Sequence, residues 1–125
     1  MTCKNIYTAA LALIGEPSDN NGTVDYSARS LMLLPIVFAR YARLSDQLTG
    51  ESLSQEGTFA ISSLEDNIPL DSRLYPVCAQ TLASMLILDE LPELSELLLS
   101  RANADAKAIA HEIVTIAATR EVYES

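Results

Sequence analysis

The residues with the most chemical potential in this sequence are a single histidine and two cysteines. His111 is followed by Glu112, and Thr115 stands four residues after the histidine. A zinc-binding His-Glu-x-x-His helix needs a second histidine at that position, and one imidazole cannot supply the ligand set that zinc requires. No metal site is therefore predicted, and His111 is interpreted as a helix-surface residue beside a glutamate.

The cysteines, Cys3 and Cys78, lie far apart in the sequence and form no Cys-x-x-Cys pair. This pattern favours two reduced thiols. A nucleophilic pair of Cys78 with His111 stays open as an alternative. It is disfavoured because Cys78 falls in the most apolar helical segment, where cysteine behaves as a small, inert hydrophobic residue.

Phosphate-binding and acid–base patterns are weak. The four glycines form neither a dinucleotide fingerprint nor a phosphate loop, and there is no Gly-x-Ser-x-Gly elbow. Neighbouring acidic residues occur at Glu65 and Asp66, at Asp89 and Glu90, and at Glu93 and Glu96. They are interpreted as solvated faces, because adjacent carboxylates lack the alternating spacing of a calcium loop. These patterns therefore identify no catalytic or cofactor-binding residue, and enzymatic activity ranks third among the functions considered.

Length and composition indicate one folded domain spanning residues 1–125. The chain has 17 acidic and 8 basic residues, a net charge of −9, and 49% hydrophobic residues. This hydrophobic content favours a folded core. The negative charge makes nucleic acid and anionic membranes poor partners. No apolar run approaches the roughly 20 residues that a membrane-spanning helix needs, so we expect no membrane association.

Hydrophobic periodicity predicts an all-α domain of about four helices. The predicted helices cover residues 2–14, 24–48, a segment that starts between 71 and 76 and ends near 89, and 92–118. A turn is predicted over Ser18–Gly22, and residues 119–125 are expected to form a frayed tail. Pro35 interrupts the second helix, where its ring and missing N–H predict a kink. The third helix is apolar on most sides from Val77 to Leu88, which predicts either the centre of the fold or partly an oligomer surface.

The periodicity fails between Thr49 and Pro69, which predicts a long connection with at most short extended pieces around Thr58–Ile61. Ser62-x-x-Glu65 in this stretch is interpreted as a local turn. Long connections are often functional, so this one is predicted to contact molecules outside the domain. Its candidate interface residues are Phe59, Leu64, Asp66 and Ile68.

A basic stripe is predicted on the second helix. Arg29, Arg40 and Arg43 fall on the side opposite its apolar face, because 11 residues make close to three turns. One interpretation is pairing within the helix, of Arg29 with Asp25 and of Arg43 with Asp46, which leaves Arg40 without such a partner. The other is that the stripe binds an acidic surface of a second copy or of a partner protein.

Four stretches, in this order, make the sequence similar to the small head-to-tail connector, or head-completion, proteins of tailed bacteriophages and prophages. They are Ala10-Leu11-x-Leu13-Ile14-Gly15-Glu16, Tyr26-x-x-Arg29-Ser30-Leu31-x-x-Leu34, Leu64-Glu65-Asp66-Asn67-Ile68-Pro69-Leu70-Asp71, and Leu74-Tyr75-Pro76-Val77-Cys78-Ala79 leading to Leu88-Asp89-Glu90. The resemblance covers about residues 1–101. The sequence departs from the family at Leu74-Tyr75-Pro76, where Leu-Pro-Tyr is typical, and at Pro35, where a polar residue is typical.

The resemblance implies a mostly helical, non-enzymatic subunit of a ring beneath the portal. Such a ring joins the capsid vertex to tail or stopper proteins and helps to retain packaged DNA, which passes through without specific binding. We therefore expect a homo-oligomer of the virion that is assembled in the host cytoplasm. The alternative, from composition alone, is a small acidic protein that inhibits a nucleic-acid enzyme by mimicking phosphate charge.

Overall fold

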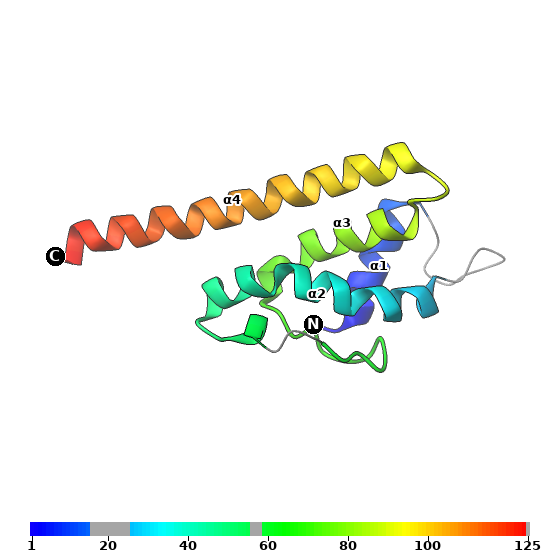
Figure 1. Cartoon of the computed structure of the whole chain (residues 1–125), viewed down its shortest axis with the longest axis horizontal. Coiled ribbons are helices and arrows are strands. Elements are labelled where there is room, and N and C mark those ends of the chain that lie inside the picture. The colour runs from blue at the N-terminus through cyan, green and yellow to red at the C-terminus, as the bar shows by residue number, and fades with distance from the viewer. Residues whose placement is uncertain (16–25, 56–58, 125) are drawn as a thin grey trace.

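The chain forms an all-α domain, as the hydrophobic periodicity predicted (Figure 1). The computed structural model describes the backbone of residues 1–15, 26–55 and 59–124, and side chains as far as residue 114. Its helices are α1 (Cys3–Leu13), α2 (Ser27–Thr49), α3 (Tyr75–Leu86) and α4 (Pro92–Glu124), with short 3₁₀ turns η1 (Leu53–Gln55) and η2 (Ser72–Leu74). The turn predicted over Ser18–Gly22 lies outside the described residues.

The helix ends follow from the residues found there. At the start of α1, the Asn5 side chain accepts a hydrogen bond from the Thr2 N–H at 2.9 Å. At the end of α2, Gly50 has a φ of +81°, and its N–H donates to the Asp46 carbonyl at 2.7 Å. Glycine is the residue that adopts this left-handed conformation without a steric penalty. Between these ends, α2 continues through Pro35 as one helix.

The last helix is longer than the sequence pattern suggested. α4 has 33 residues and continues to Glu124, so the end predicted near Ala118 is wrong. The segment is rich in alanine and contains no glycine or proline after Pro92, so nothing in its sequence ends the helix. At 1.5 Å per residue, α4 is about 50 Å long, and its C-terminal part extends beyond the other three helices (Figure 1).

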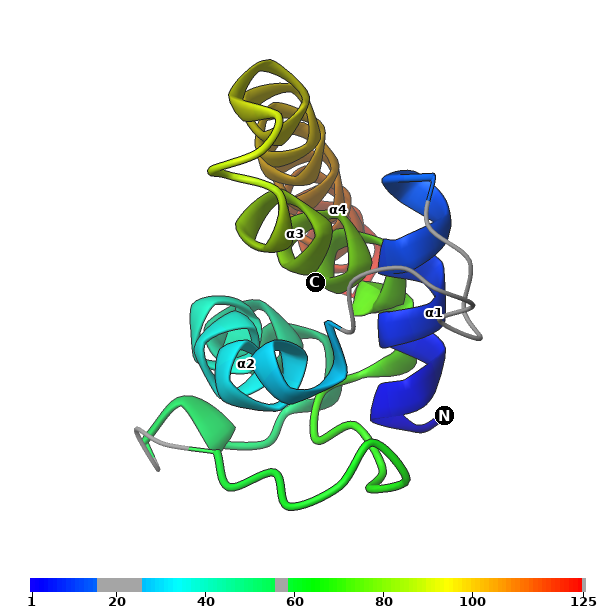
Figure 2. The same cartoon turned by 90° about the vertical axis from the view of Figure 1, so that its right-hand side faces the viewer.

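The centre of the fold is α3, which packs against α1, α2 and α4 (Figures 1 and 2). Its hydrophobic residues between Val77 and Ile87 are buried, apart from the half-buried Met85. Only Leu88, just past the helix, is largely exposed, at 57%. Of the two interpretations of this apolar helix, the first is confirmed. The chain's own helices cover most of the apolar side chains of α3, so in the single chain these offer little surface for assembly.

The connection between α2 and α3 packs against the rest of the domain. In the first turn of α1, the N–H groups of Cys3 and Lys4 donate to the carbonyls of Asp66 at 2.8 Å and Leu64 at 2.7 Å. Helix N-termini leave such donors without intrahelical partners, so the connection caps α1. Residues 59–61 form no extended strand. This stretch is therefore a structural part of the domain and is less free to reach a neighbour than its length suggested.

Candidate interaction surface

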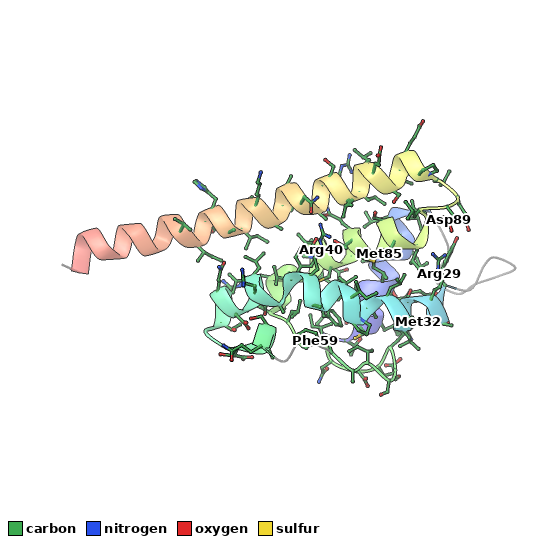
Figure 3. The ribbon with its side chains drawn as sticks, viewed as in Figure 1. Arg29, Met32, Arg40, Phe59, Met85 and Asp89 are labelled. Atoms are coloured by element: carbon green, nitrogen blue, oxygen red, sulfur yellow. The ribbon has the colours of Figure 1, made fainter. Side chains whose placement is uncertain are left out.

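Arg29 binds the end of the central helix. Its guanidinium donates hydrogen bonds to the carbonyls of Leu86 at 3.2 Å and Met85 at 3.3 Å, and Figure 3 shows Arg29 beside Met85 at one end of the bundle. Carbonyls at a helix C-terminus lack intrahelical partners and carry partial negative charge, so a cation is favourable there. Arg29 therefore stabilises α3. Its predicted partner, Asp25, lies outside the described residues.

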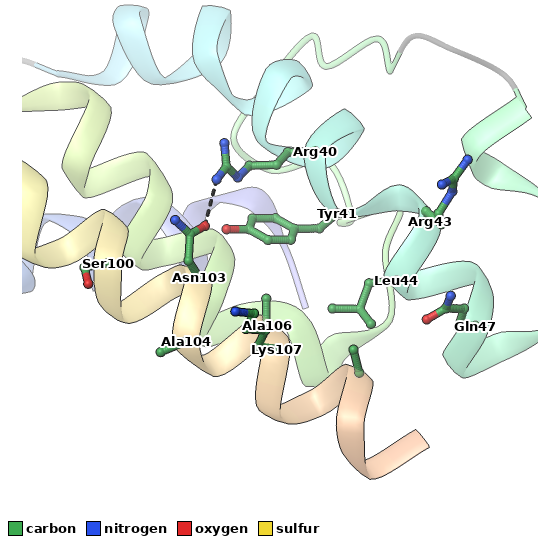
Figure 4. A pocket seen from close by; sticks show the side chains of 11 residues that line it. Arg40, Tyr41, Arg43, Leu44, Gln47, Ser100, Asn103, Ala104, Ala106 and Lys107 are labelled. Carbon is green, nitrogen blue, oxygen red and sulfur yellow. Dashed lines mark hydrogen bonds between the residues drawn. The ribbon is translucent and has the colours of Figure 1, made fainter. Parts of the chain in front are cut away.

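Arg40 links α2 to α4. Its guanidinium donates to the Asn103 side-chain oxygen at 2.8 Å and lies 5.8 Å from the centroid of the Tyr41 ring (Figure 4). The helical spacing predicts no partner for Arg40 on its own helix, and in the structure its partner is a neutral amide from another helix. A neutral partner leaves the positive charge of Arg40 uncompensated.

Arg43 is exposed and forms no hydrogen bond or ion pair with the described residues. Its predicted partner, Asp46, is engaged elsewhere. The Asp46 carboxylate accepts hydrogen bonds from the N–H groups of Leu53 at 2.8 Å and Ser54 at 2.9 Å. The interaction with Ser54 is the main cause of the lowered pKa of Asp46. The predicted Arg43–Asp46 pair is thus wrong, because Asp46 holds the turn that follows α2.

Arg40 and Arg43 line an open groove of about 800 Å³ between the second half of α2 and the middle of α4 (Figure 4). The groove is lined by Arg40, Tyr41, Arg43, Leu44, Gln47, Ser100, Asn103, Ala104, Ala106, Lys107 and Ala110. Tyr41, Leu44 and the alanines supply apolar surface, while three of the eight basic residues lie along it. Among the described residues, no carboxylate lines it. We call it the basic groove. The sequence pattern located its two arginines but not Lys107, which comes from another helix.

Phe59 is a core residue. It is 8% exposed, and its ring meets that of Phe38 edge to face, with 6.4 Å between centroids and an interplanar angle of 73°. In the single chain its side chain is therefore no surface contact, contrary to its selection as an interface candidate. Leu64 and Ile68 are half-buried and pack against the same core. These apolar residues hold the connection onto the domain.

Asp66 closes a turn. Its carboxylate accepts hydrogen bonds from the N–H groups of Ser62 at 3.0 Å and Ser63 at 3.3 Å, and from the Ser62 hydroxyl at 3.1 Å. These bonds, with the Ser62 N–H first, lower the pKa of Asp66. The local turn predicted from Ser62-x-x-Glu65 is confirmed, but Asp66 rather than Glu65 supplies the acceptor. The role of Asp66 in the single chain is structural.

The chemically reactive residues are not gathered into a site. Cys78 is 1% exposed, and burial raises the pKa of its thiol to about 12, which leaves almost no thiolate at neutral pH. His111 is exposed on α4. Among the described residues, no three His, Cys, Asp or Glu side chains cluster closely enough to hold a metal ion. In the same part of the chain, no helix is sufficiently long and apolar to cross a membrane.

The chain was compared with protein-family models, with curated proteins and with solved structures, and none of these comparisons gave a match. Fold and surface together define a small all-α domain with a basic groove on an otherwise acidic chain. What this domain does is inferred below from its surfaces and from its sequence motifs.

Proposed function

We propose that this protein is a non-enzymatic subunit of the head-to-tail connector ring of a tailed phage or prophage. Copies of the chain would join the portal and capsid vertex to tail or stopper proteins and help to retain packaged DNA. The four sequence motifs support this proposal, and so does the all-α fold that the resemblance implied. The site of action is the head–tail junction of the virion, after assembly in the host cytoplasm.

The observation that carries the proposal is an exposed apolar pair on the outer face of α2. Met32 is 76% exposed and Ile36 is 55% exposed. Residues four apart lie side by side on a helix, so the two form one apolar patch. The inner face of the same helix already fills the core with Leu34 and Phe38. Covering apolar surface yields about 25 cal/mol per Å², so this patch favours association with a neighbouring molecule.

The shape and charge of the chain also support the proposal. The C-terminal part of α4 extends beyond the bundle (Figure 1), which gives each copy the reach to contact an adjacent one. The net charge of −9 suits a channel through which DNA must slide, because a wall of like sign does not hold the phosphates.

The test is co-assembly with the candidate partners. Portal, tail and stopper proteins of the same phage or prophage are mixed with the chain, and complexes are measured by native mass spectrometry and sedimentation. A multimeric complex with one of them is expected, weakened by the double change Met32→Ser and Ile36→Ser. The matched control is Leu13→Ser, since Leu13 is an exposed apolar residue on α1. A chain that binds none of these proteins would overturn the proposal.

The acidic-inhibitor alternative predicts a different result from the same preparation. It requires tight binding to a nucleic-acid enzyme in competition with DNA and no association with portal or tail proteins. The acidic residues of the chain are spread along its length and interleaved with apolar residues. That distribution favours the connector proposal over a phosphate mimic.

A further inference from the structure

We propose that the basic groove receives the acidic turn between α3 and α4 of the next copy of the chain. The proposal rests on the ring assembly proposed above and adds which two surfaces meet. The groove is the cationic half of the contact. Arg43 and Lys107 are exposed and have no partner among the described residues, and Arg40 is bound only to neutral groups. Three positively charged side chains therefore border an apolar floor, and no carboxylate is among the described residues that line the groove.

The complementary half is the segment 88–97, here called the acidic corner. It covers the turn after α3 and the first turns of α4, and Figure 3 marks it by Asp89. Its exposed acidic residues are Asp89, Glu90, Glu93 and Glu96. The segment contains no lysine or arginine. Arg29 donates to the carbonyls at the end of α3, and Glu90 accepts a hydrogen bond from the Tyr26 hydroxyl at 3.1 Å.

The acidic corner also exposes apolar side chains. Leu88 is 57% exposed, Leu91 49% and Leu97 47%. Acidic and leucine residues thus alternate on one projecting segment, while basic residues and an apolar floor combine in the groove. Leucine side chains can be covered by the floor formed by Tyr41 and Leu44, and the carboxylates then meet the arginines and the lysine at its edge. Such complementarity fixes the register and the partner more than the affinity.

The two surfaces lie on different parts of the chain, which determines the kind of assembly. A contact between unlike surfaces leaves one groove and one corner free in every dimer, so further copies must add head to tail. Such growth closes into a ring if the rotation between neighbours allows it. This is why we choose a second copy as occupant of the groove over an unrelated acidic partner.

The test reverses the charge of each surface in turn. The groove variant carries Arg43→Glu and Lys107→Glu, and the corner variant carries Glu93→Lys and Glu96→Lys. The matched controls are Arg101→Glu and Glu51→Lys, which reverse exposed charges outside both surfaces. Self-association of each full chain is measured by sedimentation velocity over a concentration series, and circular dichroism checks that all variants keep their helices.

Each surface variant should self-associate at least about tenfold more weakly than the parent chain, because close charge pairs at interfaces contribute on this scale or above. The controls should remain within about twofold, as expected for screened surface charges. A chain that carries all four changes should recover part of the association, because the four exchanged positions are again opposite in sign while Arg40, Asp89 and Glu90 keep their charges. Recovery identifies the contact, because loss of folding in either variant could not be reversed by adding the other.

Three results separate this inference from the proposed function. Assembly that survives groove reversal but is lost in the Met32 and Ile36 variant overturns the inference and leaves the function intact. A chain that is monomeric but still binds portal protein also overturns the inference and leaves the proposed function intact. A chain whose charge reversals behave as expected but that binds no portal, tail or stopper protein supports the inference and overturns the function.

Discussion

Ser84 of α3 and Ser95 of α4 each donate a hydrogen bond to the main-chain carbonyl of the other. The Ser84 hydroxyl lies 2.9 Å from the Ser95 carbonyl, the Ser95 hydroxyl lies 2.8 Å from the Ser84 carbonyl, and the two hydroxyl oxygens are 3.0 Å apart. Both residues are buried. Both buried hydroxyl groups thus have hydrogen-bond partners at the contact between α3 and α4.

Removing one of these hydroxyls should destabilise the fold. Ser95→Ala leaves the Ser84 carbonyl without its donor in a buried place, and we expect the free energy of unfolding to fall by about 1–3 kcal/mol. Urea denaturation followed by circular dichroism measures this change. Ser100→Ala, at an exposed position of the same helix, should have little effect. Equal stability of the two variants would contradict the assigned role of the serine pair.

The burial of α3 leads to a second prediction. Leu82 is 0% exposed, so Leu82→Ala leaves a cavity in the centre of the fold. The free energy of unfolding should fall by about 2–5 kcal/mol. Leu97→Ala makes the same chemical change at a position that is 47% exposed and should cost far less. A small effect at Leu82 would mean that α3 is not the packed centre.

Stability should fall at acidic pH. The pKa values of Asp46, Asp66 and Asp71 are lowered in the folded chain, mainly by hydrogen bonds from Ser54, Ser62 and Arg73 respectively. A carboxylate with a lowered folded pKa stabilises the fold above its unfolded value of 3.8. It loses that contribution as the pH falls through the folded pKa.

The measurement is the free energy of unfolding between neutral pH and about pH 2, the range in which carboxylates titrate. Asp66→Asn keeps a hydrogen-bond acceptor but cannot titrate, so its stability should depend less steeply on pH below the unfolded value of 3.8. Glu51→Gln removes a carboxylate outside these turns and is the matched control. An unchanged acid slope in Asp66→Asn would contradict the role given to the Asp66 turn.

Both cysteines should react slowly in the folded chain. Burial raises the pKa of Cys78 to about 12, and burial together with the charge of Asp66 raises that of Cys3 to about 11. The thiolate is the reactive form, so labelling at pH 8 should be at least about a hundredfold slower than in the denatured chain. Mass spectrometry after timed alkylation measures both rates. Rapid labelling of native Cys78 would revive the nucleophile alternative.

Reversing Arg40 should weaken assembly more than folding. Arg40→Glu loses one exposed hydrogen bond to Asn103, which is worth about 0.5–1.5 kcal/mol, while it places a negative charge at the edge of the basic groove. The control Asn103→Ala removes the same hydrogen bond without reversing a charge. Sedimentation and urea denaturation of both variants separate the two effects. Equal assembly by Arg40→Glu and the parent would return Arg40 to a purely structural role.

The fold class and the four helices could be predicted because hydrophobic periodicity and the residues that end helices are local features of the sequence. Gly15 and Gly50 stand just after the first two predicted helices, and both have positive φ at the ends of α1 and α2. The end of α4 could not be predicted, because nothing in its sequence stops the helix. The central position of α3 was one of two interpretations, the other being an oligomer surface. A helix that is apolar on most sides must be covered, but its sequence does not show whether the same chain or a second one covers it.

The surface was harder to predict than the fold, for a physical reason. A helical wheel places Arg29, Arg40 and Arg43 on one side of α2, but the groups they meet come from other helices. Arg29 donates hydrogen bonds to α3 and Arg40 donates one to α4. Of the three, only Arg43 has no partner among the described residues. Lys107 joins this set through packing of α4 beside α2. Such partnerships depend on tertiary contacts that no local pattern encodes.

The hydrogen bonds from Cys3 and Lys4 to Asp66 and Leu64 limit the order in which a newly synthesised chain can fold. α1 cannot gain this cap until the connection between α2 and α3 has been synthesised. Domains form as units during synthesis, so α1 docks late although it is translated early. Before α1 docks, the nascent chain exposes the core face of α1, including Ile6 and Leu11. This is the stage at which the chain presents the most apolar surface to a chaperone.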